Sequence, residues 1–468
     1  MIDDVITALS GAIGPDKVAV DLDSLKSRRF DQWVVNHLRD WRGEVLPLPG
    51  VVVRPSSVAD VQAILRLANR ESIAVIPHGL GSGVCGGVVA SPDAILLDMS
   101  SFNAVRGVDP VNLLASFDAG KNGLEAEEAV AAHGLTIGHW PQSVAISSVG
   151  GWVSTRASGQ FSSAYGNIED IIHSIEAVLP TGELVVLGKA ARAAAGPDLR
   201  HLLMGAEGIM GVVTGVTLSL RCQAEHRAMT AFHAPTMAAG FEAQRIIYQA
   251  DWRPPVMRLY DAKEARRSFK DHANEDQGLL LMIHEGPKAR VEVEVAGVTA
   301  LALAAGLTPA PTQATADWFA RRNHVPAWRD LLERGFIVDT VEVSGSWTAI
   351  EAIYEDAVAA LEEVGGIVNA SAHSSHVYRS GINLYFSFAA KVEDSADMEP
   401  LYFECWRRIL EATARHGGGI AHHHGSGRVR RDYLHHDLGD EGVALLRRVK
   451  AALDPNMIMN PGNLLPDA

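Results

Sequence analysis

The first half of the chain alternates short apolar runs with one clear helical repeat. Residues 51–53 form an apolar run that suits a strand, and apolar side chains then recur at three- and four-residue spacing from residue 58 to residue 68. Ser57, followed three residues later by Asp60, is a typical N-terminal cap, so we predict a helix over 57–70. Other elements of this half are expected at the strands Ile73–Ile76, Ala94–Leu97, Leu113–Ala119, Ile175–Leu179, Leu184–Leu187 and Val212–Leu220, and at a helix over Gly123–Ala132.

The second half shows the same two patterns. Apolar runs predict strands at Gly278–His284, Ile337–Val343 and Asn383–Ala389, and long apolar faces predict helices at 349–364 and 397–416. From Asp440 onward we expect a helix and then several turns. This order of elements indicates the α+β class.

A chain of 468 residues exceeds the size of one ordinary core. We therefore divide it into a helical segment at 1–45 that packs on the outside, a glycine-rich α+β domain at 46–222, a second α+β domain at 223–415 and a C-terminal segment at 416–468. The composition, 47% hydrophobic and 21% charged, is that of a packed globular protein.

Charge and cysteine usage exclude several classes of protein. The formal charge of −15 leaves no basic surplus to neutralise phosphates, which excludes a dedicated nucleic-acid-binding protein but not a local anion site. The cysteines, Cys85, Cys222 and Cys405, lie too far apart to suggest a disulfide framework or a zinc cluster. No secretory signal opens the chain, and no stretch approaches the roughly 18 apolar residues of a transmembrane segment. We expect a cytoplasmic enzyme.

Three glycine-rich runs, Pro77–Gly83, Ser147–Gly159 and Gly205–Thr214, are candidates for binding phosphate. Glycine lets consecutive backbone N–H groups converge on one anion, although a single such loop is as often an ordinary tight turn. No Gly-x-Gly-x-x-Gly opens a helix with an acidic residue about 20 positions later, so the runs do not indicate a Rossmann unit.

Together these runs resemble the PCMH-type FAD-binding domain of the vanillyl-alcohol-oxidase superfamily. Val149–Gly159 followed by Tyr165–Asp170, with Gly196-Pro197-Asp198 and Met204–Gly211, is similar to the alkyldihydroxyacetonephosphate synthase family in particular. The similarity extends from about Val51 to Leu465. It implies that residues 46–222 bind FAD, that 223–415 form a cap or substrate domain, and that 416–468 return to the flavin site.

The resemblance also implies which residues contact the flavin. Related flavoproteins attach FAD covalently to a histidine or cysteine late in the first loop, but here Gly81, Ser82 and Gly83 occupy that place, with Cys85 nearby. We therefore expect FAD to bind non-covalently. The expected contacts are Pro77, His78, Gly79, Leu80, Gly81, Ser82, Gly83, Pro141, Gln142, Ser143, Ser147, Ser148, Gly150, Gly151, Ser154, Thr155, Arg156, Ala157, Ser158, Gly159, Asn167, Ile168, Glu207, Gly208, Gly211, Val212 and Val213.

The densest cluster of titratable groups is His422, His423 and His424. Histidine suits proton transfer because it titrates near neutral pH, while a solvated loop is the plainer interpretation. Three adjacent side chains do not face one way, so at most two are expected to point into a pocket. Tyr385, in a strand-like run, taken alone is an ordinary core tyrosine. The synthases carry a matching triple histidine and a matching Tyr-Phe pair, which implies that Tyr385 moves the proton on the substrate carbon that the flavin attacks.

FAD-dependent 2-hydroxyacid dehydrogenases share this architecture but carry His-x-Gly-Asp-Gly-Asn-x-His and Glu-His-Gly segments that bind a divalent metal. Here Tyr385 stands in place of the second histidine and His423 in place of the glutamate. A phenol and an imidazole make a poor site for a hard cation. We therefore predict no metal site, although His373, His376 and His424 still offer nitrogens that bind zinc.

Two arginines match functional arginines of the synthases. Arg258 lies in an Arg-Leu-x-Asp context, and Arg329 matches the arginine proposed to meet the substrate. A guanidinium suits a phosphate or carboxylate because it donates two parallel hydrogen bonds, whereas a solvated surface charge is the alternative for any single arginine.

By this resemblance, the enzyme exchanges the acyl group of acyl-dihydroxyacetone phosphate for a fatty alcohol through a flavin N5 adduct, a redox-neutral step of ether-lipid synthesis. The segment between Arg258 and Arg329 departs from that family. The alternative is therefore an FAD-dependent dehydrogenase or oxidase of a D-2-hydroxy acid such as lactate, glycolate or 2-hydroxyglutarate, or of another alcohol. A flavin-binding scaffold would have no need for Tyr385, Arg329 and the histidines. The family resemblance implies a homodimer, and peripheral membrane contact stays open without a basic amphipathic helix.

Overall fold

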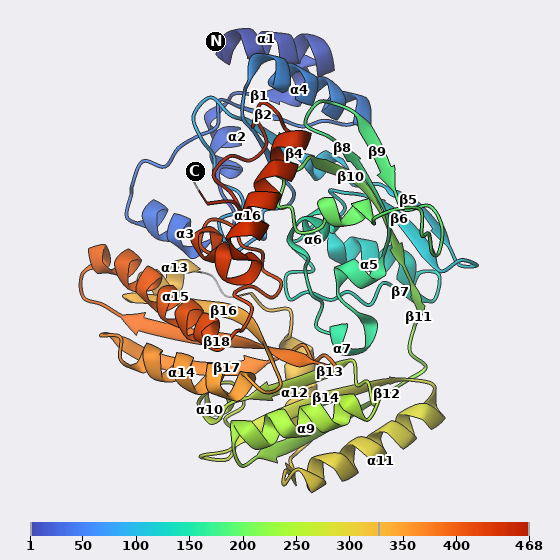
Figure 1. Ribbon diagram of the computed structural model, residues 1–468, viewed down its shortest axis with the longest axis vertical. Coiled ribbons are helices and arrows are strands. Elements are labelled where there is room, and N and C mark those ends of the chain that lie inside the picture. The colour runs from blue at the N-terminus through green and yellow to red at the C-terminus, as the bar shows by residue number, and fades with distance from the viewer. Residues whose placement is uncertain (1, 326–327, 467–468) are drawn as a thin grey trace.

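The computed structural model describes residues 2–325 and 328–466 (Figure 1). Its strands form sheets of four, five and seven strands together with a small two-stranded sheet, β11 (Arg221–Cys222) with β7 (Leu135–Thr136). In Figure 1 the four- and five-stranded sheets occupy the upper part of the molecule and the seven-stranded sheet the lower part. The predicted α+β class is confirmed.

The four-stranded sheet has the order β1 (Val18–Ala19), β2 (Val51–Val53), β4 (Ile95–Asp98) and β3 (Val75–His78). Helices α4 (Val58–Glu71) and α1 (Ile2–Ile13) bury their apolar sides in the same core as this sheet. The predicted cap is confirmed, because the Ser57 side chain accepts a hydrogen bond from the Asp60 N–H. Strand β3 begins two residues later than predicted, since the Ile73 N–H still bonds the helix carbonyl of Ala68.

The five-stranded antiparallel sheet has the order β5 (Val105–Asp109), β6 (Leu114–Asp118), β10 (Val212–Ser219), β8 (Ile172–Val178) and β9 (Leu184–Leu187). Phe117, Trp152 and Ile175 lie in its core, which also receives α5 (Gly123–Ala131) and α6 (Val149–Thr155). Short helices α7 (Ser162–Tyr165) and α8 (Ile168–Ile171) follow α6. All predicted strands of this half are present within a few residues.

The seven-stranded sheet has the order β15 (Thr308–Pro309), β12 (His226–Ala234), β14 (Gly278–Gly286), β13 (Val256–Tyr260), β17 (Ile367–Ser374), β18 (Gly381–Lys391) and β16 (Phe336–Ser346). Four helices pack against it: α9 (Met237–Gln249), α11 (Lys288–Ala304), α14 (Ile350–Glu362) and α15 (Met398–Arg415). Shorter helices α10 (Ala262–Ser268), α12 (Gln313–Arg321) and α13 (Trp328–Leu332) connect its strands.

The register of this sheet aligns four side chains in one row. Tyr260 on β13 is paired with His373 on β17, His373 with Tyr385 on β18, and Tyr385 with Glu342 on β16. Directly opposed residues of antiparallel strands point to the same face, so the four side chains share one face of the sheet. We call this set the sheet row.

One sequence-based expectation about the N-terminal segment is wrong. Helices α1 and α2 (Leu22–Ser27) do lie outside, but α3 (Val34–Trp41) is inserted into the core of the seven-stranded sheet, where Leu38 is fully buried. Trp33, just before it, donates a hydrogen bond of 3.0 Å from Nε1 to the hydroxyl of Tyr402 on α15. The apolar positions of α3 are few and close together, which conceals their role in the sequence.

The C-terminal segment returns to the upper part of the molecule (Figure 1). Helix α16 (Leu434–Leu453) begins six residues before the predicted start, with a break at Gly439, whose φ is 66°. Lys450 donates hydrogen bonds to the carbonyls of Ile209 and Met459, which ties the helix to the third glycine-rich run. Residues 467 and 468 of the predicted segment lie outside the described residues. Among the described helices none is long and apolar enough to cross a membrane.

Replacing Leu38 with Ala should destabilise the protein, because it leaves a cavity where α3 meets the core of the seven-stranded sheet. Such truncations cost about 2–5 kcal/mol. Thermal unfolding at a fixed heating rate would show a lower unfolding temperature. Val45→Ala, at a site that is 99% exposed, is the matched control and should change nothing. Equal unfolding temperatures for both variants would contradict the burial of α3.

Candidate active site

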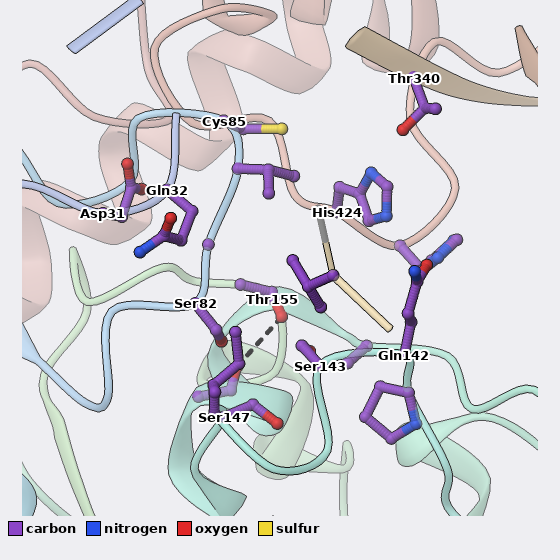
Figure 2. A pocket seen from close by; sticks show the side chains of 18 of the residues that line it. Asp31, Gln32, Ser82, Cys85, Gln142, Ser143, Ser147, Thr155, Thr340 and His424 are labelled. Carbon is purple, nitrogen blue, oxygen red and sulfur yellow. Dashed lines mark hydrogen bonds between the residues drawn. The ribbon is translucent and has the colours of Figure 1, made fainter. Parts of the chain in front are cut away.

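A cavity of about 930 Å³ lies between the glycine-rich runs and the seven-stranded sheet. We call it the main cavity. Figure 2 shows Ser82, Ser143, Ser147 and Thr155 on one side of it and His424 on another. All the predicted flavin contacts line this cavity except Arg156, Gly159, Asn167 and Ile168. Arg156 and Asn167 line a second cavity instead.

The first two glycine-rich runs contact each other at Gly79, which has no side chain. A Cβ atom on Gly79 would lie 2.5 Å from the Ser148 hydroxyl, so any other residue would push the two runs apart. Gly208 in the third run has a φ of +79°, which other residues rarely adopt. The cavity wall is therefore largely backbone, which provides N–H groups for a phosphate-bearing ligand.

The sheet row forms the opposite side of the main cavity, which is lined by Tyr260, His373 and Tyr385. The rings of His373 and Tyr385 stack with centroids 4.6 Å apart, and His373 Nδ1 lies 3.0 Å from Glu264 Oε1. Burial raises the pKa of Tyr385 far above its ordinary value, so this hydroxyl keeps its proton near neutral pH.

The loop that carries His422, His423 and His424, which we call the histidine loop, places a proton acceptor next to the Tyr385 hydroxyl. The Tyr385 hydroxyl lies 2.6 Å from His423 Nε2, and His423 Nδ1 lies 2.7 Å from His422 Nδ1. Two of the three imidazoles, those of His423 and His424, line the main cavity, in agreement with the limit predicted from sequence. Burial lowers the pKa of His422 to about 4 and that of His423 well below its ordinary value, so both rings are neutral at pH 7.

Two buried carboxylates hold this loop in place. Glu342, the end of the sheet row, accepts hydrogen bonds from the backbone N–H groups of His423 and His424 and pairs with the Arg430 guanidinium and His424 Nδ1. Glu207 accepts hydrogen bonds from two N–H groups farther along the loop, those of Ser426 and Gly427. Burial alone would raise the pKa of Glu342, but the charge of Arg430 and the contact with His424 outweigh burial and hold it well below its ordinary value.

The predicted arginines lie in different places. Arg258 lines the main cavity, donates a hydrogen bond of 2.8 Å to the Tyr260 hydroxyl and lies over the ring of Trp318. Arg329 is not among the residues that line it. Its side chain is 77% exposed and pairs with Glu333, the residue that follows the helix. Its assigned role stays a prediction.

Sequence reasoning missed other groups in the cavity wall. Arg321 and Arg322 line the main cavity beside Arg258, and no ion pair of these three arginines is found among the described residues. Asp31, which precedes α3, is buried there, and burial raises its pKa to about 7. The adjacent Arg321-Arg322 pair could have been noticed, whereas nothing in the sequence marks Asp31.

The histidines that lie close enough together to bind one metal ion are not the three that the sequence suggested. His376, His422 and His423 offer nitrogens within 4.8 Å of one another, whereas the sequence suggested His373, His376 and His424. Each of the three is engaged in hydrogen bonds, His376 with Ser162 and the other two with each other. The cysteines are free, and Cys85 is buried at the cavity wall.

Replacing Glu342 with Gln should destabilise the fold by about 3–5 kcal/mol, because Arg430 is left buried without its counter-charge. Since the pKa of Glu342 is depressed, its stabilisation is fully present above pH of about 4.3 and is lost as the pH falls below that value. Thermal unfolding measured between about pH 3 and pH 7 tests both the loss of stability in the variant and the pH dependence of the stabilisation by Glu342. The double variant Glu342→Gln, Arg430→Met removes both charges and should recover part of the loss. A single variant as stable as the double one would contradict this account.

Comparison with known proteins agrees with this geometry. Residues 49–188 match the family described as FAD binding domain, and 223–464 match the C-terminal domain of FAD linked oxidases. The FAD-linked oxidoreductase YgcU of Escherichia coli is 32% identical over 99% of this chain and 98% of its own. The alkyldihydroxyacetonephosphate synthase of Dictyostelium discoideum is 29% identical over 97% of this chain and 79% of its own.

The D-lactate dehydrogenase of Archaeoglobus fulgidus is 28% identical over 89% of this chain and 91% of its own. Among solved structures, an alkyldihydroxyacetonephosphate synthase superposes with a TM-score of 0.80 at 25% identity, covering 98% of this chain and 84% of its own. The fold is also that of p-cresol methylhydroxylase, with a TM-score of 0.80 at 16% identity and coverage of 99% and 97%. The chain is thus an FAD-dependent enzyme that belongs to the FAD-linked oxidases, with a PCMH-type FAD-binding domain and the C-terminal domain of that family.

Proposed function

We propose that this enzyme is a transferase similar to the alkyldihydroxyacetonephosphate synthases, which exchanges the acyl group of acyl-dihydroxyacetone phosphate for a fatty alcohol. The observation that carries the proposal is the Tyr385 hydroxyl, held at the main cavity 2.6 Å from a neutral His423. A phenol beside a neutral imidazole suits a proton transfer without net oxidation, whereas it is a poor substitute for the metal set of the hydroxyacid dehydrogenases.

FAD would be held by the glycine-rich side of the main cavity, where the backbone of the Pro77–Gly83 and Ser147–Ser158 runs is open to phosphate oxygens. When bound, the flavin supplies the electron-pair chemistry at the substrate carbon. His78 and Cys85 both reach this cavity, but each is buried with a partner, the Gly79 carbonyl and the Arg430 guanidinium respectively. We therefore propose non-covalent binding. Acid precipitation tests this, since a covalent flavin would stay with the pellet.

Tyr385 and His423 would handle the proton of the substrate carbon. The hydroxyl of Tyr385 can pass its proton to His423 Nε2 while its oxygen accepts the proton from the carbon, so that no phenolate persists. This matters because burial makes a free phenolate at Tyr385 costly. His424 and Glu342 fix the loop and leave His423 aimed at Tyr385.

An anionic end of the substrate fits the arginine side of the same cavity. Arg258 and Arg322 both line it, burial lowers the pKa of Arg322, and Arg322 Nε is buried without a hydrogen-bond partner among the described residues. A phosphate would supply acceptors for both guanidinium groups. A carboxylate would do so too, so a D-2-hydroxy acid is the second candidate, which the similarity to a D-lactate dehydrogenase favours.

Anaerobic absorbance spectroscopy of the flavin decides between the two candidates. If the proposal holds, palmitoyl-dihydroxyacetone phosphate removes the oxidised band and hexadecanol restores it without an oxidant. Tyr385→Phe should slow this change by about 10²–10⁴-fold with the flavin content unchanged, because general acid–base groups contribute that much. Tyr248→Phe, on α9 and away from the cavity, is the control. Full reduction by D-lactate or D-2-hydroxyglutarate, reversed only by an electron acceptor, would instead establish a dehydrogenase.

Replacing Arg258 with Met should raise KM for the anionic substrate by about tenfold or more, since hydrogen bonds to charged groups are worth about 1.5–3 kcal/mol. Steady-state kinetics with the substrate found above measures it. Arg329→Met is the comparison variant, because the sequence-based role of Arg329 requires a similar increase whereas its exposed position predicts almost none. A raised KM for Arg329→Met alone would restore the sequence-based assignment.

A further inference from the structure

We propose that His423, His422 and Tyr378 form a proton relay, which connects the Tyr385 hydroxyl in the main cavity with a second cavity on the other side of the histidine loop. The proposal deepens the proposed function, because it rests on Tyr385 handling a proton. It assigns a role to Tyr378, which lies in the loop between β17 and β18. The relay residues act through Tyr385 and are therefore positioning and proton-conducting groups.

The relay is an unbroken series of short contacts. Tyr385 Oη lies 2.6 Å from His423 Nε2, His423 Nδ1 lies 2.7 Å from His422 Nδ1, and His422 Nε2 lies 2.7 Å from Tyr378 Oη. Each imidazole thus uses both of its nitrogens within the series. A neutral imidazole has one donor and one acceptor nitrogen, which is the arrangement that a relay requires.

The contact between the two Nδ1 atoms couples the rings. At 2.7 Å one of these nitrogens must carry the proton and the other must accept it. If His423 carries the Nδ1 proton, its Nε2 accepts from Tyr385 and His422 donates through Nε2 to Tyr378. If His422 carries it, every bond in the series reverses. The geometry therefore supports two complementary states, which differ by the transfer of one proton along the relay.

The far end of the relay opens into the second cavity, of about 1020 Å³, which Tyr378 and His422 line. His423 lines both cavities and so bridges them. The lining of the second cavity includes Leu438 and Leu445 on α16, which are 45% and 55% exposed, so this cavity reaches the protein surface. Water there can accept a proton from Tyr378.

The hydroxyl of Tyr378 is itself held in position. Asn167 Nδ2 donates to it at 3.1 Å, and Asn167 Oδ1 in turn accepts a hydrogen bond of 2.7 Å from the Ser158 hydroxyl. These bonds fix the direction in which the Tyr378 hydroxyl faces His422 Nε2. Asn167, which was predicted to contact the flavin, lines the second cavity together with Tyr378.

Protons balance along the relay. Tyr385 gives its proton to His423 Nε2, and the Nδ1 proton of His423 moves to His422 Nδ1. The Nε2 proton of His422 then moves to the Tyr378 oxygen, and the Tyr378 proton passes to water. The net change is one proton taken from Tyr385 and one released in the second cavity, with all three relay side chains neutral again. Tyr385 is replenished by the proton of the substrate carbon, and the reverse sequence delivers a proton to it.

In this relay Tyr385, which lines the main cavity, would also deliver the proton that reduced FAD takes up there, so proton uptake during reduction of the bound flavin tests the relay without any substrate. Two molecules of reduced methyl viologen supply two electrons and release no proton, so conversion of oxidised FAD to the anionic reduced form takes up one proton from solution. Anaerobic stopped-flow measurements follow flavin absorbance and a pH-indicator dye together. In the unmodified holoenzyme the two signals should coincide. In Tyr378→Phe the dye signal should lag about tenfold or more, since positioned proton-transfer groups contribute at least this much.

His422→Ala is a second variant, and added imidazole, which fits the second cavity, should restore its dye signal but not that of Tyr378→Phe. Tyr354→Phe, which removes a hydroxyl bonded to Asp261 outside both cavities, is the control and should behave as the unmodified protein. Coincident signals in Tyr378→Phe and His422→Ala, both with full flavin content, would overturn the relay. If Tyr378→Phe lags but palmitoyl-dihydroxyacetone phosphate leaves the flavin unchanged, the relay stands and the proposed transferase reaction falls.

Discussion

The active site depends on one buried ion pair, Glu342 with Arg430. Both side chains are fully buried, and such a pair is tolerated only when hydrogen bonds satisfy the remaining atoms. Here they satisfy most of them: the carboxylate also receives two backbone N–H groups and pairs with His424, and the guanidinium reaches the Gly425 carbonyl, while Arg430 Nε has no hydrogen-bond partner among the described residues. The pair therefore joins strand β16 to the histidine loop. Since Glu342 is the cross-strand partner of Tyr385, the same strand sets the position of the tyrosine and of the imidazole beside it.

The sheet row and the histidine loop contain the positions at which the sequence differs from the metal-binding segments of the hydroxyacid dehydrogenases. The hydroxyacid dehydrogenases carry a metal-binding histidine where this chain has Tyr385, and a metal-binding glutamate where it has His423. In this chain both residues project from positions set by strand pairing and by the loop anchors. Overall similarity relates the chain to synthases and dehydrogenases alike.

The sequence predicted the flavin half of the molecule better than the other half. Its strands are apolar runs with glycine turns, and its motifs are contiguous, so most residues on the glycine-rich side of the main cavity could be named. Strands β12, β13 and β17 were missed because polar side chains interrupt their apolar pattern, as Arg258 does in β13. The anchors Glu342 and Arg430 were missed for another reason: each is a single charged residue, 88 positions apart, and only the fold makes them partners. Arg329 was named from its motif, but a motif does not say which way a helix turns its side chain.

The burial of α3 has a consequence for the order in which the protein can be completed. The ribosome makes Trp33 and Leu38 early, whereas the core that receives them is closed by α15, more than 350 residues later, where Tyr402 meets Trp33. Until then Trp33 has a neighbour in Gly86, but the core around α3 lacks α13 and α15. Contacts so distant along the chain form slowly and leave apolar surface exposed in the meantime. The packing of α3 is therefore completed only after nearly all of the remainder has been synthesised, although Phe30 and Gln32 just before it already pair with the segment around Gly83 and Val89.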